Sequence, residues 1–369
     1  MTINSSTAFG TDGLIESTRS IPQSRLNRAK RSFVTRRVDL GAVRAIDPNR
    51  RPVAGDLCLA VVERIGNHQR LELPSGRRAR LHVGDEIIVS YGARYAADQF
   101  HAGVPDAAGP CSLAAAGGLA ADVLERHTST RVPTRIRSLG TLCQKSGASV
   151  RLADFALDRR TATSTEAPLV VLVTGTGMNA GKTTTVAALV RGFGAAGLRT
   201  AALKVTGTGA GGDIWQYLDA GADTVADFTD AGHASTYGLD VEELLTIWDT
   251  LVQHASSNIE VIIVEIADGL LQQETAALLT SGSLVDRVDQ TVLAAADPLS
   301  VRSAVAILAD AGLPPSLVSG RFTASPVASQ EVTRDGPVVV AAQEALSCAD
   351  RVAPLVFADR NRELLPCAE

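Results

Sequence analysis

The chain has 369 residues, of which 45% are hydrophobic and 20% charged, and its formal net charge is −5. The length indicates two domains, or one large domain with an extension, and the mildly acidic balance gives no sign of a nucleic-acid binder. No signal peptide and no apolar run long enough to cross a bilayer is visible, and five scattered cysteines lack C-x-x-C spacing. We therefore expect a cytoplasmic protein that contacts neither membrane nor nucleic acid and has no disulfide framework or zinc site.

The first segment, residues 1–32, is polar and has no sustained hydrophobic period, so we expect a disordered or loosely ordered arm. Basic residues gather in its second half and just beyond it. Three interpretations are open: a solvated face, a contact with the acidic body of the protein, or a contact with an anionic ligand. The cluster comprises Arg25, Arg28, Lys30, Arg31, Arg36 and Arg37.

Residues 33–157 lean toward an alternation of apolar and polar positions, as in 57–62 and 86–90, with glycine-rich turn signals between the runs. Short strands separated by frequent turns are typical of a small antiparallel barrel or sandwich. The stretch AADVLERH, residues 120–127, has a helix-like composition. We therefore predict a mainly-β accessory domain with one helix.

One loop of this segment is a candidate site. Tyr91–Tyr95 (YGARY) places two aromatic residues and Arg94 after a predicted strand, and Asp98, His101 and His127 lie near it in sequence. Together these side chains line a polar substrate pocket, or they are ordinary surface residues.

A change of pattern marks the domain boundary. Residues 158–168 are polar and threonine-rich and end in a proline, as in a linker. Beyond them strands and helices alternate, which indicates a parallel sheet with crossover helices over 169–360, followed by a tail at 361–369. We expect strands near 169–174, 200–204, 260–265, 290–295, 315–319 and 337–341, and helices near 181–196, 213–221, 240–256, 271–280, 299–312 and 343–351. Ligands of such sheets bind at the carboxyl ends of the strands.

The stretch LVVLVTGTGMNAGKTTT, residues 169–185, has the order of a phosphate-binding loop. A buried strand leads into a glycine-punctuated turn and then into a helix whose positive end meets phosphates. Lys182 would reach the outer phosphates, and the Thr183 hydroxyl would bind Mg²⁺. The spacing is one residue longer than G-x-x-x-x-G-K-T, and the alternative is a glycine-rich turn with a chance Lys-Thr pair. The predicted nucleotide-binding residues are Gly175, Thr176, Gly177, Met178, Asn179, Ala180, Gly181, Lys182, Thr183 and Thr184.

Charged residues follow two of the other predicted strands. Lys204 closes the second strand, where it lies beside the phosphates or is a solvated charge. Asp213 opens a helix and is either a Mg²⁺ ligand or only an N-cap, with Asp227 as a weaker rival. Glu265 follows a run of β-branched residues and is the expected second metal-facing carboxylate, while Asp268 is a partner of that site or a turn residue.

The absence of a guanine-binding motif bears on which base the nucleotide carries. No Asn-Lys-x-Asp guanine signature occurs in a strand-end loop, which favours ATP over GTP. The segment Ser319–Phe322 (SGRF) follows the fifth strand and is a candidate for contact with the base.

The loop 175–183, the sequence Lys204-Val-Thr-Gly and the pair Val264-Glu265 followed by Gly269 together resemble the dethiobiotin synthetase-like (SIMIBI) superfamily of P-loop NTPases, over the C-terminal domain only. The resemblance implies that Lys182 and Thr183 hold phosphates and Mg²⁺, that Lys204 orients the substrate or γ-phosphate, and that Asp213 and Glu265 complete the metal site. It also implies a homodimer. Val205 replaces a proline of that family and Ile266-Ala267-Asp268 replaces its glycine-rich run, so biotin synthesis itself is not expected. A looser likeness runs to the GTP-binding adaptor of molybdopterin-guanine dinucleotide synthesis.

The predicted protein is therefore an α/β P-loop NTPase domain preceded by a small mainly-β, barrel-like domain. We expect an ATP- and Mg²⁺-dependent kinase or ligase that transfers the γ-phosphate to a small-molecule acceptor, with a carboxylate as the expected acceptor group. Lys182, Lys204 and Glu265 are the predicted catalytic residues, and Thr183, Asp213 and Glu265 the predicted metal ligands. The β domain would close over the acceptor site or mediate the dimer. The alternative is a nucleotide-switched adaptor or metallochaperone.

Overall fold

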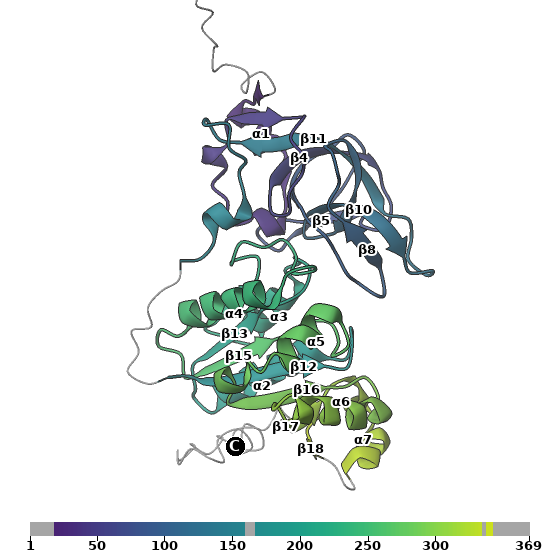
Figure 1. Cartoon of the computed structure of the whole chain (residues 1–369), viewed down its shortest axis with the longest axis vertical. Helices are drawn as coiled ribbons and strands as arrows, with labels where there is room; N and C mark the ends of the chain where they lie inside the picture. The colour runs from purple at the N-terminus through teal and green to yellow at the C-terminus, as the bar shows by residue number, and fades with distance from the viewer. Residues whose placement is uncertain (1–17, 159–166, 334–336, 342–369) are drawn as a thin grey trace, which may run out of the picture.

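The computed structural model describes residues 18–158, 167–333 and 337–341, which form two domains, each with its own sheet (Figure 1). The β domain is drawn in purple to blue, and the P-loop domain lies beside it in teal to yellow. Most of the predicted linker, the predicted helix at 343–351 and the tail at 361–369 lie outside the described residues.

The β domain is built around a closed ring of strands. Its sheet follows the order β1-β3-β11-β4-β7-β10-β8, and β9 pairs with both β10 and β11, which closes β11, β4, β7, β10 and β9 on themselves. This confirms the predicted barrel-like, mainly-β domain. The described strands are β1 Arg19–Ser20, β2 Lys30–Arg31, β3 Ala45–Asp47, β4 Leu57–Arg64, β7 Glu86–Tyr91, β8 Phe100–Gly103, β9 Pro110–Ala115, β10 Leu119–Arg126 and β11 Thr134–Cys143, with a separate hairpin of β5 Arg70–Glu72 and β6 Arg78–Arg80.

Strand β4 shows why this sequence forms a barrel with apolar layers on both sides. Leu57 and Leu59 point into one buried cluster, whereas Cys58, Ala60 and Val62 point into another. Successive side chains of a strand point to opposite faces, so an unbroken apolar run is stable only when both faces are covered.

Two expectations for this domain are wrong. Residues 18–32 are not a loose arm: α1 (Gln23–Arg28) buries Leu26, and β2 pairs in parallel with β7. Ile21, Leu26 and Ala29 recur on one side of this short segment and are buried in the β-domain core, which outweighs the polar composition. The stretch 120–127 is not a helix but most of β10, because pairing with β7, β8 and β9 overrides its helical propensity.

The P-loop domain contains, within the described residues, a seven-stranded sheet in the order β14-β13-β15-β12-β16-β17-β18, and every pairing in it is parallel. The predicted strands and helices lie where we expected them over 169–319, while β14 and α7 were not predicted. The strands are β12 Leu169–Gly175, β13 Thr200–Lys204, β14 Thr224–Asp227, β15 Val261–Glu265, β16 Gln290–Ala294, β17 Pro315–Ser319 and β18 Val338–Val339. The helices are α2 Lys182–Ala195, α3 Gly212–Asp219, α4 Val241–Ala255, α5 Gln273–Thr280, α6 Pro298–Asp310 and α7 Pro326–Thr333. Short 3-10 turns lie at η1 Phe33–Thr35, η2 Leu40–Ala42, η3 Leu152–Phe155, η4 Val285–Arg287 and η5 Arg321–Ala324.

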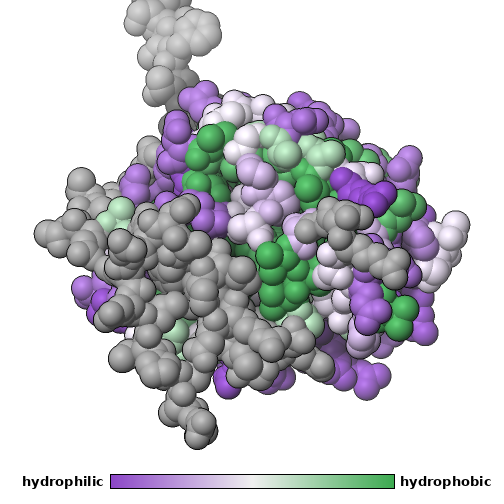
Figure 2. Space-filling view, turned by 90° about the horizontal axis from the view of Figure 1, so that it is seen from below, coloured by the Kyte–Doolittle hydropathy of each residue, from purple (hydrophilic) through white to green (hydrophobic). Residues whose placement is uncertain are grey.

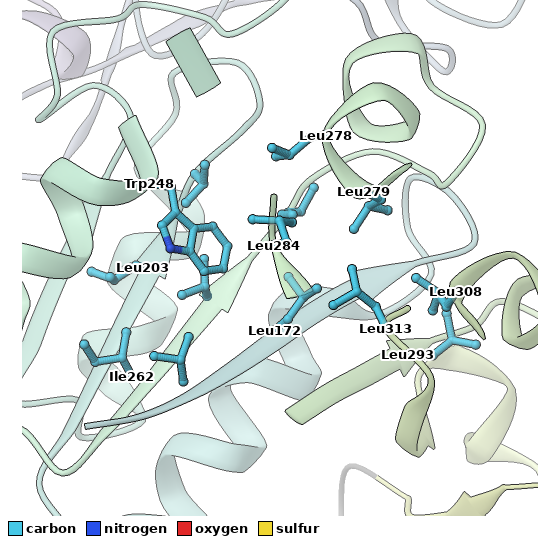
Figure 3. Close-up of a cluster of buried hydrophobic side chains, with 14 of the residues drawn as sticks. Leu172, Leu203, Trp248, Ile262, Leu278, Leu279, Leu284, Leu293, Leu308 and Leu313 are labelled. Atoms are coloured by element: carbon cyan, nitrogen blue, oxygen red, sulfur yellow. The ribbon is translucent and has the colours of Figure 1, made fainter. Parts of the chain in front are cut away.

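Helices cover both faces of this sheet. Leu172 of β12 packs with side chains of α4 to α7, and Figure 3 shows Trp248 of α4 and the leucines of α5 gathered around the strands on this face. Val171 and Val173, its neighbours in the same strand, pack on the other face against α2 and α3. The strand is therefore buried along its whole length, as its sequence predicts.

The two domains share a core. Phe33 and Val34 of η1 belong to the same buried cluster as α2 and α3, and Ala234 of the P-loop domain belongs to the β-domain cluster. Phe33 meets Trp215 edge-on at 6.1 Å between ring centroids. The interface is therefore continuous with both interiors.

Polar contacts add to this interface. Arg36 lies over the Phe33 ring and forms ion pairs with Asp227, at 3.0 Å, and with Asp230. Glu72 of β5 accepts hydrogen bonds from the amide of Gly211 (3.0 Å) and from Nε1 of Trp215 (2.9 Å). Of the interpretations of the basic cluster, Arg36 thus fits a contact with the acidic body of the protein.

The described helices and the surface can be compared with what a membrane-spanning protein requires. None of the described helices combines the length and the apolar character needed to cross a bilayer. Figure 2 shows one end of the molecule, where apolar and polar residues are interspersed. Exposed apolar side chains include Leu299 of α6 and Val327 of α7.

Candidate nucleotide-binding site

The phosphate loop connects the end of β12 to the start of α2. Gly181 precedes α2 in a left-handed conformation (φ 100°), and a Cβ there would lie 3.0 Å from the amide nitrogen of Arg321. A Cβ at Gly175 would lie 2.9 Å from the Ala294 carbonyl oxygen. Both positions therefore need glycine, one for its backbone angle and both for space. The first amides of α2 have no side-chain cap, as expected of a helix end that receives an anion.

Neighbouring loops hold this loop in place. The amide of Thr176 donates to the Ala294 carbonyl at 3.0 Å, and its hydroxyl accepts from the amide of Ala296 at 3.2 Å. On the other side, the Arg321 amide donates to the carbonyl of Ala180 at 2.8 Å. The loop is thus fixed by the ends of β16 and β17, its neighbours in the sheet.

Lys182 is the first residue of α2, and its side chain turns back across the loop. Its ammonium donates to the carbonyls of Gly177 (2.9 Å) and Asp268 (2.5 Å). The side chain is almost fully buried, and this burial lowers its pKa. Among the described residues the ammonium bonds only to carbonyls, which do not neutralise its charge, so it is available to an incoming anion.

Thr183, Lys204, Asp213 and Glu265 form one polar network. The Thr183 hydroxyl donates to Oδ1 of Asp213 at 3.0 Å, and Lys204 forms ion pairs with Asp213 and, at 3.6 Å, with Glu265. Lys204 and Glu265 come together because they are register partners at the ends of the parallel strands β13 and β15. Glu265 also accepts a hydrogen bond from the Tyr217 hydroxyl.

The charges in this network stabilise one another. Burial alone would raise the pKa of Asp213, but Lys204 and the Thr183 hydroxyl together lower it. Burial opposes protonation of Lys204, yet Asp213 and Glu265 raise its pKa well above the ordinary value. Both carboxylate and ammonium are therefore charged at neutral pH.

The oxygen ligands of this network fit Mg²⁺. A hydroxyl and a carboxylate oxygen stand 3.0 Å apart at Thr183 and Asp213, and Glu265 lies on the same cavity. Mg²⁺ prefers such hard oxygen donors together with phosphate oxygens and water. No group of three or more His, Cys, Asp or Glu side chains suited to a metal occurs in the described part of the chain. Phosphate oxygens of a nucleotide would thus complete the coordination.

Asp227 and Asp268, the weaker candidates, differ in position. Asp227 ends β14, and its carboxylate is bound to Arg36 and Thr229 at the domain interface. Asp268 has a left-handed backbone (φ 63°) and lies on the same cavity as Lys182, where burial raises its pKa.

A cavity of about 450 Å³ lies over the phosphate loop, and residues of both domains line it. Lys182, Lys204 and Glu265 come from the P-loop domain, whereas Arg94 and Tyr95 come from the β7–β8 loop of the β domain. All predicted metal and catalytic side chains therefore face one space. The lining consists of Arg94, Tyr95, Ala96, Met178, Asn179, Gly181, Lys182, Thr183, Thr184, Lys204, Gly207, Thr208, Asp213, Glu265, Ala267 and Asp268.

The β7–β8 loop also contacts the tip of the phosphate loop. The side-chain amide of Asn179, whose φ is 60°, donates to Oδ2 of Asp98 at 3.2 Å. A second cavity of about 460 Å³ shares the wall formed by Tyr95 and is lined by His101, His127 and Tyr237. Most of the candidates from the sequence 91–101 thus line cavities; Tyr91 instead is buried in the barrel and bonded to Ser138.

A third cavity, of about 460 Å³, also borders the phosphate loop. It is lined by Gly181 and Thr184 of the loop and by Gly320, Arg321 and Thr323, which follow β17. The segment expected to contact the base therefore lies next to the loop.

Sequence analysis missed Tyr217. Its hydroxyl orients Glu265, and the residue lies one helical turn after Asp213 on α3. Positions i and i+4 of a helix share a face, so the spacing to Asp213 was an available signal.

A buried parallel strand, a glycine loop, a helix that begins with Lys-Thr and carboxylates at neighbouring strand ends give this mixed α/β domain the features of a P-loop nucleotide-binding site. No known protein-family model matches the sequence, and no curated protein matches it.

Solved structures with a related arrangement were found. The signal recognition particle receptor FtsY of Elizabethkingia anophelis is 16% identical, with a TM-score of 0.31 over 55% of this chain and 58% of that one. A DUF1611 family protein of Anabaena variabilis is 16% identical, with a TM-score of 0.36 over 55% of this chain and 61% of that one. The signal recognition particle 54 kDa protein of Aeropyrum pernix, in complex with GDP, is 16% identical, with a TM-score of 0.31 over 56% of this chain and 50% of that one. This chain thus spans between half and two thirds of each, and its class rests on the loop and sheet rather than on these likenesses.

Proposed function

We propose that the protein is an ATP- and Mg²⁺-dependent enzyme that transfers the γ-phosphate to a small-molecule acceptor, as a kinase or a ligase. The observation that carries the proposal is the shared cavity of about 450 Å³, in which Lys182, Lys204, Glu265 and the β-domain residues Arg94 and Tyr95 face one space. A cavity that extends beyond the phosphate loop to a second domain offers room for an acceptor beside the phosphates.

Phosphoryl transfer needs positioning and charge stabilisation more than covalent help from the protein. Lys182 and Lys204 would stabilise negative charge on the transferred group. Mg²⁺, held by Thr183, Asp213 and Glu265, would neutralise phosphate oxygens. Three cationic side chains and three carboxylates line the cavity. With Asp213 and Glu265 assigned to Mg²⁺, Lys182 and Arg94 are left to bind anionic groups, which favours an anionic acceptor such as a carboxylate.

The base would occupy the cavity of about 460 Å³ beside Gly320 and Arg321. We expect adenine there, because the sequence lacks the guanine signature. The acceptor would approach from the side of Tyr95. A homodimer in the cytoplasm is the expected form, and light scattering measures its mass.

The test begins with nucleotide. Titration calorimetry should show binding of ATP that depends on Mg²⁺ and exceeds binding of GTP, and a panel of small carboxylic acids should accelerate ADP release. Lys182→Ala should abolish both, while Lys145→Ala, at an exposed lysine of the β domain, should change neither. Unchanged turnover in Lys182→Ala would refute the assignment. A preference for GTP with no stimulation by any acceptor would instead favour the nucleotide-switched adaptor.

A further inference from the structure

Arg94 is a buried charge on the wall of the phosphate cavity. It lies in the β7–β8 loop of the β domain, and only 7% of the residue is exposed. Its side chain lines the same cavity as Lys182 and Lys204. An arginine of another domain therefore reaches the site of the phosphates.

This guanidinium has no carboxylate partner among the described residues. Nη1 donates to the carbonyl of Ala114 and lies 3.4 Å from Nε2 of His68, Nη2 donates to Oε1 of Gln99 at 3.1 Å, and Nε is buried without a partner. The Phe100 ring, 6.0 Å from the guanidinium carbon, gives weak further support. Burial lowers the pKa of Arg94 to about 10, so the side chain stays charged at neutral pH.

Two acidic residues lie near Arg94, and neither pairs with it. Asp98 and Asp268 act on Arg94 through their charge, but neither forms an ion pair with it in the described structure. Oδ2 of Asp98 accepts a hydrogen bond from Asn179 of the phosphate loop, and Oδ1 of Asp98 is buried without a hydrogen-bond partner. Arginine is rarely buried without an anionic partner, because an unpaired buried charge is costly.

We propose that Arg94 is an anion-binding residue of the active site, which receives an oxyanion within the shared cavity. This rests on the proposed function and refines it, because it makes the β domain part of the catalytic site. The guanidinium fork suits both a carboxylate and a phosphoryl group. The oxyanion is either the transferred phosphoryl group or a carboxylate of the acceptor, and the two sources are separable by experiment.

The experiment measures the affinity of two probes by calorimetry for the full-length protein. The first probe is aluminium fluoride added to the protein with ADP and Mg²⁺, which imitates the transferred phosphoryl group. The second is malonate added to the protein with a non-hydrolysable ATP analogue and Mg²⁺. We expect Arg94→Met to weaken at least one probe by about tenfold or more, and Arg94→Lys to weaken it less. Loss of aluminium fluoride binding identifies the phosphoryl group, and loss of malonate binding identifies the acceptor anion.

The matched control is Arg51→Met, at an exposed arginine of the same domain that pairs with Asp106. It should change neither affinity. If wild type binds the ATP analogue but Arg94→Met binds both probes as wild type does, or wild type binds neither probe, this proposal is overturned while the proposed function stands. If wild type binds no nucleotide at all, the proposed function fails with it.

A second measurement covers the case in which Arg94→Met does not fold. The ¹⁵N–¹H signal of the Arg94 Nε group, assigned by its absence in Arg94→Lys, should shift when either probe is added to wild type. A signal that both probes leave unmoved overturns the proposal.

Discussion

Glu72 offers the sharpest test of how the β domain supports the nucleotide site. Its carboxylate is 2% exposed and accepts hydrogen bonds from the Gly211 amide (3.0 Å) and from Nε1 of Trp215 (2.9 Å). These bonds fix the start of α3, where Asp213 lies in the first turn. Replacing Glu72 by alanine would leave the buried Gly211 amide and the half-buried Trp215 indole N–H without this acceptor.

The magnitude follows from the contacts. A hydrogen bond to a charged acceptor contributes about 1.5 to 3 kcal/mol, so losing two should lower the free energy of unfolding by about 3 to 6 kcal/mol. Glu72→Gln keeps the shape and one acceptor oxygen, and should cost about 1 to 2 kcal/mol. Because Asp213 would lose its fixed position, we also expect the Mg²⁺ concentration that supports half-maximal nucleotide binding to rise in Glu72→Ala.

Urea unfolding followed by tryptophan fluorescence and circular dichroism measures the first effect, since Trp215 itself reports on the contact. Nucleotide titrations at several Mg²⁺ concentrations measure the second. The control is Glu63→Ala, whose carboxylate pairs with Arg137 (2.6 Å) near the surface and should contribute less than about 1 kcal/mol. The reasoning is refuted if Glu72→Ala unfolds at the same urea concentration as Glu63→Ala and shows the same Mg²⁺ dependence as wild type.

Three further predictions concern the loop, the metal ligands and pH. Gly181→Ala forces a side chain into a left-handed position 3.0 Å from the Arg321 amide, and should weaken nucleotide binding by about tenfold or more, at a cost of about 1 to 2 kcal/mol of stability, in calorimetry and thermal unfolding. Gly194→Ala, in open space within α2, is its control and should be neutral or stabilising by up to about 1 kcal/mol. Asp213→Asn removes the charge of a proposed Mg²⁺ ligand and should raise the Mg²⁺ requirement about tenfold, whereas unchanged Mg²⁺ titrations would exclude this residue as a ligand. Burial, with a smaller contribution from a neighbouring arginine, lowers the pKa of His68 from 6.5 to about 4, so below pH 6.5 the unfolded chain binds a proton that the folded chain does not. The free energy of unfolding should therefore fall as the pH drops from 6.5 toward 4, and a His68→Gln variant with the same slope in urea unfolding would contradict this.

The parts of the fold that follow from contiguous signals were predictable. The phosphate loop could be found because strand, glycines, lysine and hydroxyl all lie within 169–185. Lys204 and Glu265 could be expected near it because parallel strands end at one edge of a sheet, and they are register partners. The position of the candidate site could thus be predicted from short, contiguous stretches of the sequence.

Features that depend on tertiary contacts were not predictable. Strand β14 has only four residues and no alternation of its own; it is defined by pairing with β13. The stretch 120–127 reads as a helix because alanine, leucine and glutamate favour one, but barrel closure makes it a strand. The segment 18–32 has a polar composition, but three of its apolar side chains, Ile21, Leu26 and Ala29, are buried in the β-domain core.

The site shows the same division. The sequence indicated Arg94 as one of several loop candidates, but its burial without a counter-ion is a property of the assembled domains. Likewise, the sequence favoured Asp213 over Asp227 but left Asp213 open between a Mg²⁺ ligand and an N-cap. The structure separates them, because Asp227 is bound to Arg36 of the β domain.

The shared interior of the two domains limits how the chain can be divided. Phe33 and Val34 fill a cluster whose other members belong to the P-loop domain, so a fragment beginning at residue 168 would expose an apolar hollow beside α3. Truncation at the linker would thus remove side chains that cover apolar surface of the P-loop domain. The two domains should therefore be kept together in engineered variants. A replacement β domain would need residues that make the contacts of Phe33, Arg36 and Glu72 with the P-loop domain.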